Sequence, residues 1–295
     1  MSFYKYIILI SAVLLISCQK EIDVELPPYS SKIIVEGWID YDDYATVFVT
    51  RSSDYFAPLN EEALMDMIIT DAVVVVEDLQ GVIDTLKLGF DETLSFPLRY
   101  KGDKIKGEYG GVYNLRIFHE EYIITATTTI PQPFEFDTIY YVEQFPEHRM
   151  GFLRMKFTDR AGENNYYRIF SMVLGKHSNF RPALNSTFDD RLFDGQEMIY
   201  ELYQGQASNI ISPDYYQDSL HYLKYYFGDG DTILLKYATM DYDHYKFWYT
   251  AEWIINAGDN PFLSPAPIHS NIDGAMGVWG GYASRIDTLY LRYVE

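Results

Sequence analysis

The chain has 295 residues, a formal net charge of −20 and a single cysteine. Such an acidic chain is repelled by nucleic-acid phosphates and by anionic lipid surfaces, so charge argues against both as partners. One thiol excludes an internal disulfide, so stability must come from hydrophobic burial, and the length is sufficient for one or two domains.

The first 17 residues have the composition of an export signal. Lys5 is their one charged residue, and residues 6–17 are uncharged and mostly aliphatic. A membrane-spanning helix needs about 20 consecutive apolar residues. Because this run is shorter, we predict a cleaved signal peptide over residues 1–17.

Cys18 makes that signal specific. Leu15-Ile16-Ser17-Cys18 resembles a bacterial lipobox, which implies cleavage between Ser17 and Cys18 and lipidation of the Cys18 thiol. Several buried acyl chains anchor a protein stably where one anchors it weakly. The alternative is a free cysteine in an ordinary secretory signal, but the position, the small preceding residue and the lack of any other cysteine favour the lipid.

Residues 18–30 are predicted to form a lipidated tether. Lys20 with the acidic residues Glu21 and Asp23 resembles the surface-export signal of Bacteroidota lipoproteins, and Pro27-Pro28 would stiffen the segment. The alternative is that these charges only keep a linker solvated.

Residues 31–132 are predicted to form a β-sandwich of immunoglobulin-like or transthyretin-like type. Short alternating or β-branched segments are separated by turn residues, and this spacing is typical of such sandwiches. The strands are predicted at residues 32–39, 45–50, 72–77, 111–117 and 122–128, and the prolines at 131 and 133 end the domain.

Residues 133–295 are predicted to form a second β-rich domain. Strands are expected at residues 150–158, 165–173, 199–204, 232–238 and 286–294. Residues 178–197 contain proline, asparagine and aspartate and are expected to form a long loop. One helix is predicted near residues 242–256, with an N-cap at Asp241 to Asp243. Its stripe of Tyr245, Trp248, Tyr249 and Trp253 is expected to pack in the core.

The segment over residues 260–282 passes from three prolines to a run of glycines around two aromatic residues. It is expected to be an ordered loop that leads into a glycine-containing strand. Phe262, His269, Asn271 and Trp279 are its candidate residues for contact with a ligand or partner. The alternative is that they shape the loop and pack in the core. The chain's 28 tyrosines allow the same two interpretations, β-structure or a contact surface.

Catalytic motifs are missing from the sequence. It contains no G-x-S-x-G elbow, no H-E-x-x-H zinc motif and no phosphate-binding loop, and its six histidines are scattered. We therefore expect no enzyme activity, no cofactor and no bound metal. Three groups could supply oxygen ligands to calcium, namely Asp229-Gly230-Asp231, Asp40-Tyr41-Asp42-Asp43, and Asp189-Asp190 with Asp194, but none matches an EF-hand loop. A hairpin turn is favoured for Asp229-Gly230-Asp231.

Several motifs together resemble Bacteroidota lipoproteins that carry the domain of unknown function 4249. They are the lipobox, AVVVVED, GGVYNLRI, FTDRAGENNYYRI and NPFLSPAPIHSNIDGAMGVWGGYA, and the resemblance covers nearly the whole mature chain. It implies an outer-membrane lipoprotein that is often encoded beside a TonB-dependent receptor. It implies no catalytic residues.

Three functions follow as hypotheses. The first is a non-catalytic accessory or binding partner of a TonB-dependent transporter, anchored in the outer membrane by lipid and facing the cell exterior. The second is a surface hydrolase that acts on glycans, and the third is an adhesin or structural surface protein.

Overall fold

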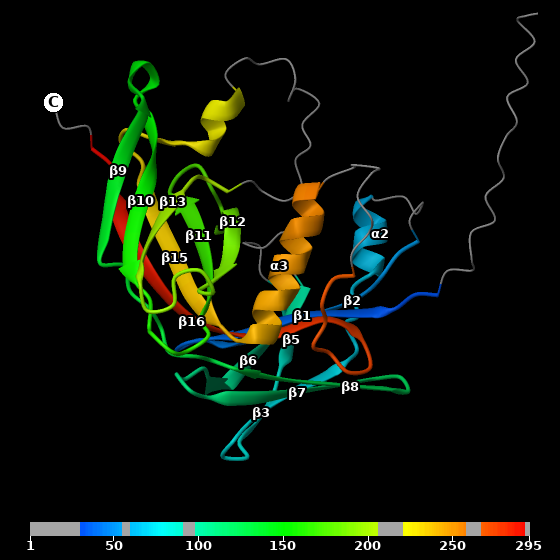
Figure 1. Ribbon diagram of the computed structural model, residues 1–295. Coiled ribbons are helices and arrows are strands. Elements are labelled where there is room, and N and C mark those ends of the chain that lie inside the picture. The colour runs from blue at the N-terminus through cyan, green and yellow to red at the C-terminus, as the bar shows by residue number, and fades with distance from the viewer. Residues whose placement is uncertain (1–29, 55–59, 91–97, 206–220, 258–266, 293–295) are drawn as a thin grey trace, which may run out of the picture. The chain divides into compact units, whose positions relative to one another are not determined.

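Strands dominate the computed structural model, which describes residues 30–54, 60–90, 98–205, 221–257 and 267–292 (Figure 1). The chain is mainly β, as predicted. In the described residues the strands form three sheets. We call them the central sheet and the first and second covering sheets.

The central sheet has eight strands and draws them from both halves of the chain. Neighbouring strands are antiparallel except for the first and last in the chain, β1 and β16, which pair in parallel. Its order is β12 (Arg181–Asp189), β11 (Tyr166–Val173), β15 (Thr232–Met240), β16 (Met276–Tyr290), β1 (Ile33–Asp40), β2 (Tyr44–Arg51), β6 (Leu98–Lys106) and β5 (Lys87–Phe90).

The two covering sheets have four described strands each. The first contains β4 (Ile83–Thr85), β3 (Val73–Asp78), β7 (Val112–His119) and β8 (Tyr122–Thr129). The second contains β13 (Glu197–Leu202), β10 (Met150–Thr158), β14 (Phe227–Gly228) and β9 (Thr138–Phe145). Short 3₁₀ turns occupy Pro146–His148 (η1) and His221–Tyr225 (η3).

Each covering sheet encloses its own hydrophobic core. Alternate residues of β1, such as Val35, pack with Val74, Leu115 and Trp279 in the first core. The second core is aromatic, and Phe134 packs edge-on against Tyr167 and Tyr237 there. Period-two burial is what a strand with one covered face requires, and each core is therefore a sandwich between the central sheet and one covering sheet.

Strand β16 belongs to both halves. Met276 to Tyr282 pair with β1, and Trp279 lies in the first core. Farther along, Leu289 packs against the second core. The boundary that we placed after residue 132 thus falls between two cores, while the central sheet is continuous across it. Residues Lys32–Glu295 form one compact unit.

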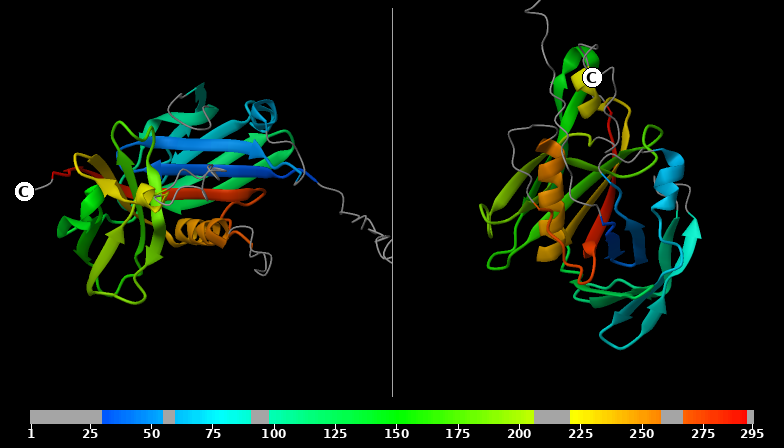
Figure 2. Two further views of the ribbon diagram at one scale, coloured as in Figure 1. Left: turned by 90° about the horizontal axis from the view of Figure 1, so that it is seen from above. Right: turned by 90° about the vertical axis from the view of Figure 1, so that its right-hand side faces the viewer.

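Helix α3 (Tyr242–Ala257) lies on the face of the central sheet opposite the covering sheets (Figure 2). Its N-cap is the predicted Asp241, whose Oδ1 accepts the amide of His244 at 2.8 Å. Glu252, two turns on, accepts hydrogen bonds from the hydroxyls of Ser186 and Thr187 in β12. The second α-helix in the described chain, α2 (Glu61–Asp66), is short and was not predicted.

The aromatic stripe of α3 is only half in the core. Tyr245 is buried, and Trp248 is half-buried against the guanidinium of Arg168, which lies 3.6 Å from the centre of a Trp248 ring. Tyr249 and Trp253 are 42% and 45% exposed, so the prediction of core packing was wrong for them. Within the described residues α3 packs on the central sheet and meets the loop before β16 through His269, and these contacts leave Tyr249 and Trp253 partly exposed.

Two other element predictions also need correction. Residues 178–197 contain β12 rather than a long loop. Pro182 and Asn185, which suggested a loop, are tolerated because β12 is an edge strand with an irregular register opposite β11. The expected glycine-containing strand and the closing strand are one continuous strand, β16.

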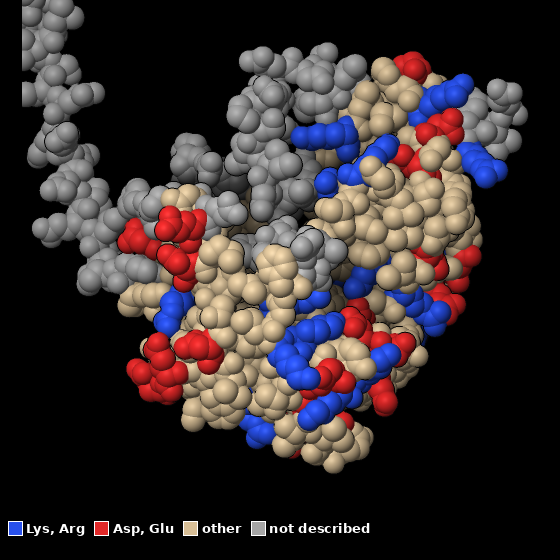
Figure 3. Space-filling view, turned by 180° about the vertical axis from the view of Figure 1, so that it is seen from behind, with Lys and Arg blue, Asp and Glu red and all other residues tan. Residues whose placement is uncertain are grey.

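The net charge of −20 does not produce an unbroken acidic surface. Seen from behind, Lys and Arg side chains are intermixed with Asp and Glu (Figure 3). Lys101 pairs with Asp43 at 2.9 Å and Lys106 with Asp42 at 2.8 Å. Among the described residues, no helix has the length and apolar character that a membrane crossing requires.

Candidate functional site

Of the four candidate residues of the predicted ligand loop, the structure describes His269, Asn271 and Trp279, and each contacts another part of the protein. Asn271 pairs with the backbone of Trp279 on both sides, since its Nδ2 donates to the Trp279 carbonyl at 2.7 Å and its Oδ1 accepts the Trp279 amide at 3.0 Å. Trp279 is fully buried and donates its indole N–H to the carbonyl of Tyr113. His269 contacts Asp243 of α3 at 2.9 Å. Phe262, Ser17 and Cys18 lie outside the described residues.

A recess of about 210 Å³ lies where β16 ends, beside β9 and the start of β10. We call it the terminal recess. The residues that line it are Ile139, Tyr140, Tyr141, Arg149, Leu153, Asp229, Leu289, Tyr290, Leu291 and Arg292. These residues come from four separate stretches of the chain.

The Asp229-Gly230-Asp231 turn brings those stretches together. It is a turn, as predicted, but not a hairpin, because β14 pairs with β10 in the second covering sheet while β15 lies in the central sheet. Gly230 adopts a φ of 83°, which a residue without a Cβ tolerates. The Gly230 amide donates to the carbonyl of Leu291 at 3.0 Å, and the Asp229 amide donates to the carbonyl of Arg149 at 3.0 Å. The turn therefore fixes both the end of β16 and the start of β10 around the recess.

Charges of both signs stand at the terminal recess. Arg149 Nη1 lies 3.4 Å from Asp229 Oδ2, and Arg292 belongs to the same lining. Burial, followed by the nearby carboxylates of Glu143 and Asp229, raises the pKa of Tyr141 to about 12. Tyr141 thus stays a neutral hydroxyl, and it donates to the carbonyl of Phe227 at 3.3 Å. The site offers hydrogen-bond donors and acceptors around an apolar floor.

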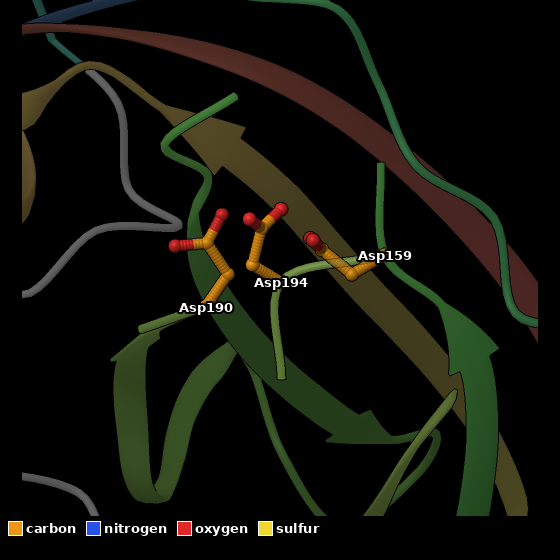
Figure 4. A group of neighbouring side chains, drawn as sticks. All are labelled: Asp159, Asp190 and Asp194. Atoms are coloured by element: carbon orange, nitrogen blue, oxygen red, sulfur yellow. The ribbon is translucent and has the colours of Figure 1, made fainter. Parts of the chain in front are cut away.

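Three carboxylates also meet at the end of β10, where Asp159, Asp190 and Asp194 each place an oxygen within 4.8 Å of the others (Figure 4). The sequence had already singled out Asp190 and Asp194 as oxygen donors, but not Asp159. Such oxygens are the ligands that calcium prefers.

Hydrogen bonds to the surrounding loops account for this cluster without an ion. Asp159 accepts the hydroxyl of Tyr167 and the amide of Gly195. Asp190 accepts the amide of Asn165 at 2.6 Å, and Asp194 accepts the amide of Gly162 at 2.7 Å. The three aspartates thereby tie the loop after β10 to the loop after β12.

The sequence matches the family described as "Domain of unknown function (DUF4249)" over residues 19–286. The chain belongs to the DUF4249 family. Tyr140, Arg149 and Asp229 of the terminal recess lie inside the matched range of DUF4249, whereas Tyr290 and Arg292 lie beyond it. Membership of the family therefore does not show whether the recess is a shared feature of the family, since part of its lining lies outside the matched residues.

Comparison with known proteins adds little beyond DUF4249. No curated protein matches the chain. One similar solved structure is that of a DUF4785 family protein from Legionella pneumophila, with 11% sequence identity and a TM-score of 0.24. The match covers 70% of this chain and 52% of that protein, so the chain spans about half of that protein's length. A likeness of this size supports no conclusion about function.

Proposed function

We propose that this chain is a non-catalytic binding lipoprotein of a Bacteroidota outer membrane, facing the cell exterior and serving as the accessory partner of a TonB-dependent transporter. The observation that carries the proposal is the Leu15-Ile16-Ser17-Cys18 lipobox, with Lys20 and Glu21 directly after it. A short tether then leads to β1, which begins at Ile33. The resemblance to lipoproteins often encoded beside TonB-dependent receptors supplies the partner class.

The composition of the terminal recess supports binding over hydrolysis. Most glycoside hydrolases place two carboxyl groups about 5–10 Å apart across the scissile bond. Among the described residues that line the recess, Asp229 alone carries a carboxylate. The described lining therefore offers no second carboxyl group for this chemistry.

The decisive experiment is affinity purification of the tagged protein from native outer membranes in mild detergent, followed by mass spectrometry. The wild-type chain should co-purify with a TonB-dependent barrel at a fixed stoichiometry. The matched control is Cys18→Ala, which removes the acylated thiol and should lose both the membrane fraction and the barrel. Recovery of the wild-type lipoprotein without a barrel would contradict the transporter role and favour a freestanding adhesin or enzyme.

Exposure on the cell surface is tested separately. Proteinase K added to intact cells should degrade the wild-type protein. A variant with Lys20→Ala and Glu21→Ala should be protected until the outer membrane is opened, because the charged tether is the proposed export signal. Protection of the wild-type protein on intact cells would contradict the outward orientation.

A further inference from the structure

We propose that the free edge of strand β16 binds an extended segment of a partner protein as an added antiparallel strand, with an aliphatic side chain in the terminal recess and a basic side chain opposite Asp287. This interaction goes beyond the proposed function and does not depend on a transporter. It follows from the unpaired backbone of β16, the regularity of its edge, the recess on its inner face and the charge beside that recess.

Strand β16 has a neighbour on both sides for only part of its length. Strand β1 pairs with it from Met276 to Tyr282, and β15 pairs with it from Tyr282 to Tyr290 (Figure 1). Among the described strands, none lies against the β1 side of β16 after Tyr282. The second half of β16 therefore has a free edge in the described part of the chain.

The backbone groups that face this edge follow from one hydrogen bond. The Ser284 amide donates to Asp40 Oδ1 of β1 at 3.1 Å, so the backbone of Ser284 points away from β15. Alternate residues of an antiparallel strand point their N–H and C=O groups to the same side. Ile286, Thr288 and Tyr290 therefore point their N–H and C=O groups away from β15 as well, where the described chain offers them no strand.

The free edge lacks the features that usually protect such strands. Protected edges are short or bulged, or they carry proline or lysine. In the central sheet, edge strand β12 has Pro182 and an irregular register, and edge strand β5 is short. Residues Arg285–Tyr290 keep a regular register with β15 and contain neither proline nor lysine, and Arg285 is already paired with Glu135. Their backbone can therefore accept another extended segment.

Side chains of an added strand would alternate between two environments. On the outer face of the sheet they would lie beside Ile286 and Tyr290, which are 55% and 70% exposed. On the inner face they would lie beside Leu289, which lines the terminal recess together with Ile139 and Leu153 of the second covering sheet. In strand addition, backbone hydrogen bonds provide affinity, and pockets for alternate side chains provide specificity.

The size of the terminal recess suits a side chain. It measures about 210 Å³, and pockets for drug-sized molecules measure about 300–1,000 Å³. Leu153 and Leu291 in its lining are almost fully buried. An aliphatic side chain that enters the recess would therefore be removed from water against other aliphatic groups, which is favourable.

Charge selects the residue that precedes or follows this aliphatic position on the same face. Asp287 lies two residues before Leu289 and therefore on the same side of β16. Its half-buried carboxylate accepts the Tyr237 hydroxyl at 3.0 Å, and a carboxylate has further acceptor sites. A basic residue opposite Asp287 would form a favourable cross-strand pair. The net charge of −20 attracts a basic segment and repels a second copy of this chain.

Fluorescence anisotropy with the full mature lipoprotein in mild detergent tests the proposal. The probe is the labelled peptide Lys-Thr-Leu-Thr-Arg-Thr-Lys, which in the antiparallel register places its leucine opposite Leu289 and its arginine opposite Asp287. We expect saturable binding. Replacing the leucine of the peptide by serine should weaken binding about tenfold, because the recess loses an aliphatic side chain. Replacing its arginine by glutamate should also weaken binding.

Methylated peptides test whether the backbone pairs with the edge. In this register the threonine N–H groups point to β16, whereas the N–H groups of the leucine and arginine point away from it. N-methylation of the three threonines should abolish binding. N-methylation of the leucine and arginine should preserve most of it, and it serves as the matched control.

A substitution in β16 places the binding at this edge. Thr288→Pro removes an N–H group that points away from β15, so the pairing of β15 with β16 should persist while peptide binding weakens about tenfold. Thr288→Val keeps the N–H group and should bind like the wild-type protein. The methylated peptides need no variant, so they decide the question even if Thr288→Pro fails to fold.

Three results would overturn the proposal. They are the absence of saturable binding, an equal loss from both methylated peptides, and equal binding by Thr288→Pro and Thr288→Val. Wild-type dimers in sedimentation that Thr288→Pro abolishes would also overturn it, because a second copy would then occupy the edge. None of these results decides whether the wild-type protein co-purifies with a barrel, so the two proposals fail separately.

Discussion

At the scale of single residues, Asp84 joins two sheets by one buried carboxylate. It lies in β4 of the first covering sheet with no exposed surface, and its Oδ2 accepts the amides of Asp103, Lys104 and Ile105 in β6 at 2.8–3.1 Å. Hydrogen bonds to a charged group contribute about 1.5–3 kcal/mol each, and a buried donor left unpaired costs a similar amount.

Asp84→Ala should therefore lower the free energy of unfolding by about 3 kcal/mol or more. Urea denaturation followed by circular dichroism measures the change. The control is Asp103→Ala, which removes an exposed carboxylate paired with Lys87 and should change stability little. Equal effects of the two substitutions would show that the three amides do not need Asp84.

His244 predicts a dependence of stability on pH. Burial, and then the positive charge of Arg168, lowers its pKa to about 3, from about 6.5 in the unfolded chain. Between these values the unfolded state binds the extra proton, so stability is lost as pH falls. We expect His244 alone to lower the free energy of unfolding by about 2 kcal/mol between pH 7.5 and 5.

Substitution isolates that contribution. His244→Phe should remove most of the loss between pH 7.5 and 5, and His148→Phe, at an exposed position in η1, should not. Denaturation curves at several pH values provide the measurement. A slope that His244→Phe leaves unaltered would mean that other groups cause the dependence.

The residue scale also shows why the predicted loop could not be assigned from sequence. Histidine, asparagine and tryptophan serve equally as ligand contacts or as internal hydrogen-bonding groups. The Asn271 amide can bond to the backbone of Trp279 only because the loop turns back and brings these two residues together. No local pattern in the sequence shows this turn of the loop.

At the scale of elements, the docking of α3 depends on Gly280 in β16. A Cβ at this position would overlap the imidazole of His244, which lies directly above the strand. Overpacking a rigid site costs about 1–3 kcal/mol. Gly280→Ala should therefore destabilise the protein by about 2 kcal/mol and raise hydrogen exchange along α3.

A matched glycine provides the control for this prediction. Gly89 lies in β5, and a Cβ there would meet nothing within 4 Å, so Gly89→Ala should be tolerated. Hydrogen exchange read by mass spectrometry follows the α3 amides in both variants. Unchanged exchange in Gly280→Ala would mean that the helix is held independently of this contact.

Elements with regular patterns were predictable, and those that depend on their neighbours were not. The bounds of strand β10 and of helix α3 match the sequence predictions closely, because period-two and helical spacing are local signals. Strand β12 was missed because its proline and asparagine are acceptable only at a sheet edge. Whether a strand lies at the edge of a sheet depends on how the strands pair, and the sequence of the strand itself does not show it.

At the scale of the whole molecule, the terminal recess shows the limit of sequence reasoning. A turn at Asp229-Gly230-Asp231 was predicted, and the chain's 28 tyrosines were interpreted as either β-structure or a contact surface. Residues of β9 and of the end of β16 meet in one lining because both elements border the second core. All of the lining lies within the predicted second domain, but it is spread from residue 139 to residue 292, so no local motif in the sequence reports it.

The continuous central sheet leads to the last prediction, which concerns cooperativity. Two domains divided after residue 132 would unfold separately, whereas a shared central sheet couples the two cores. Phe157 is fully buried in the second core, and Phe157→Ala should cost about 4 kcal/mol. Strand β7 lies in the first covering sheet. If the central sheet couples the cores, the opening free energy that hydrogen exchange reports for the β7 amides should fall by a similar amount.

The wild-type protein should correspondingly unfold in one transition. Circular dichroism follows the strands of both halves, and tryptophan fluorescence follows Trp279 in the first core together with Trp38 and the two tryptophans of α3, so the two signals should coincide. Two separated transitions, or protection of β7 amides that Phe157→Ala leaves intact, would mean that the boundary after residue 132 divides independent folding units after all. The terminal recess would then depend on the second unit alone, because each described residue in its lining follows residue 132.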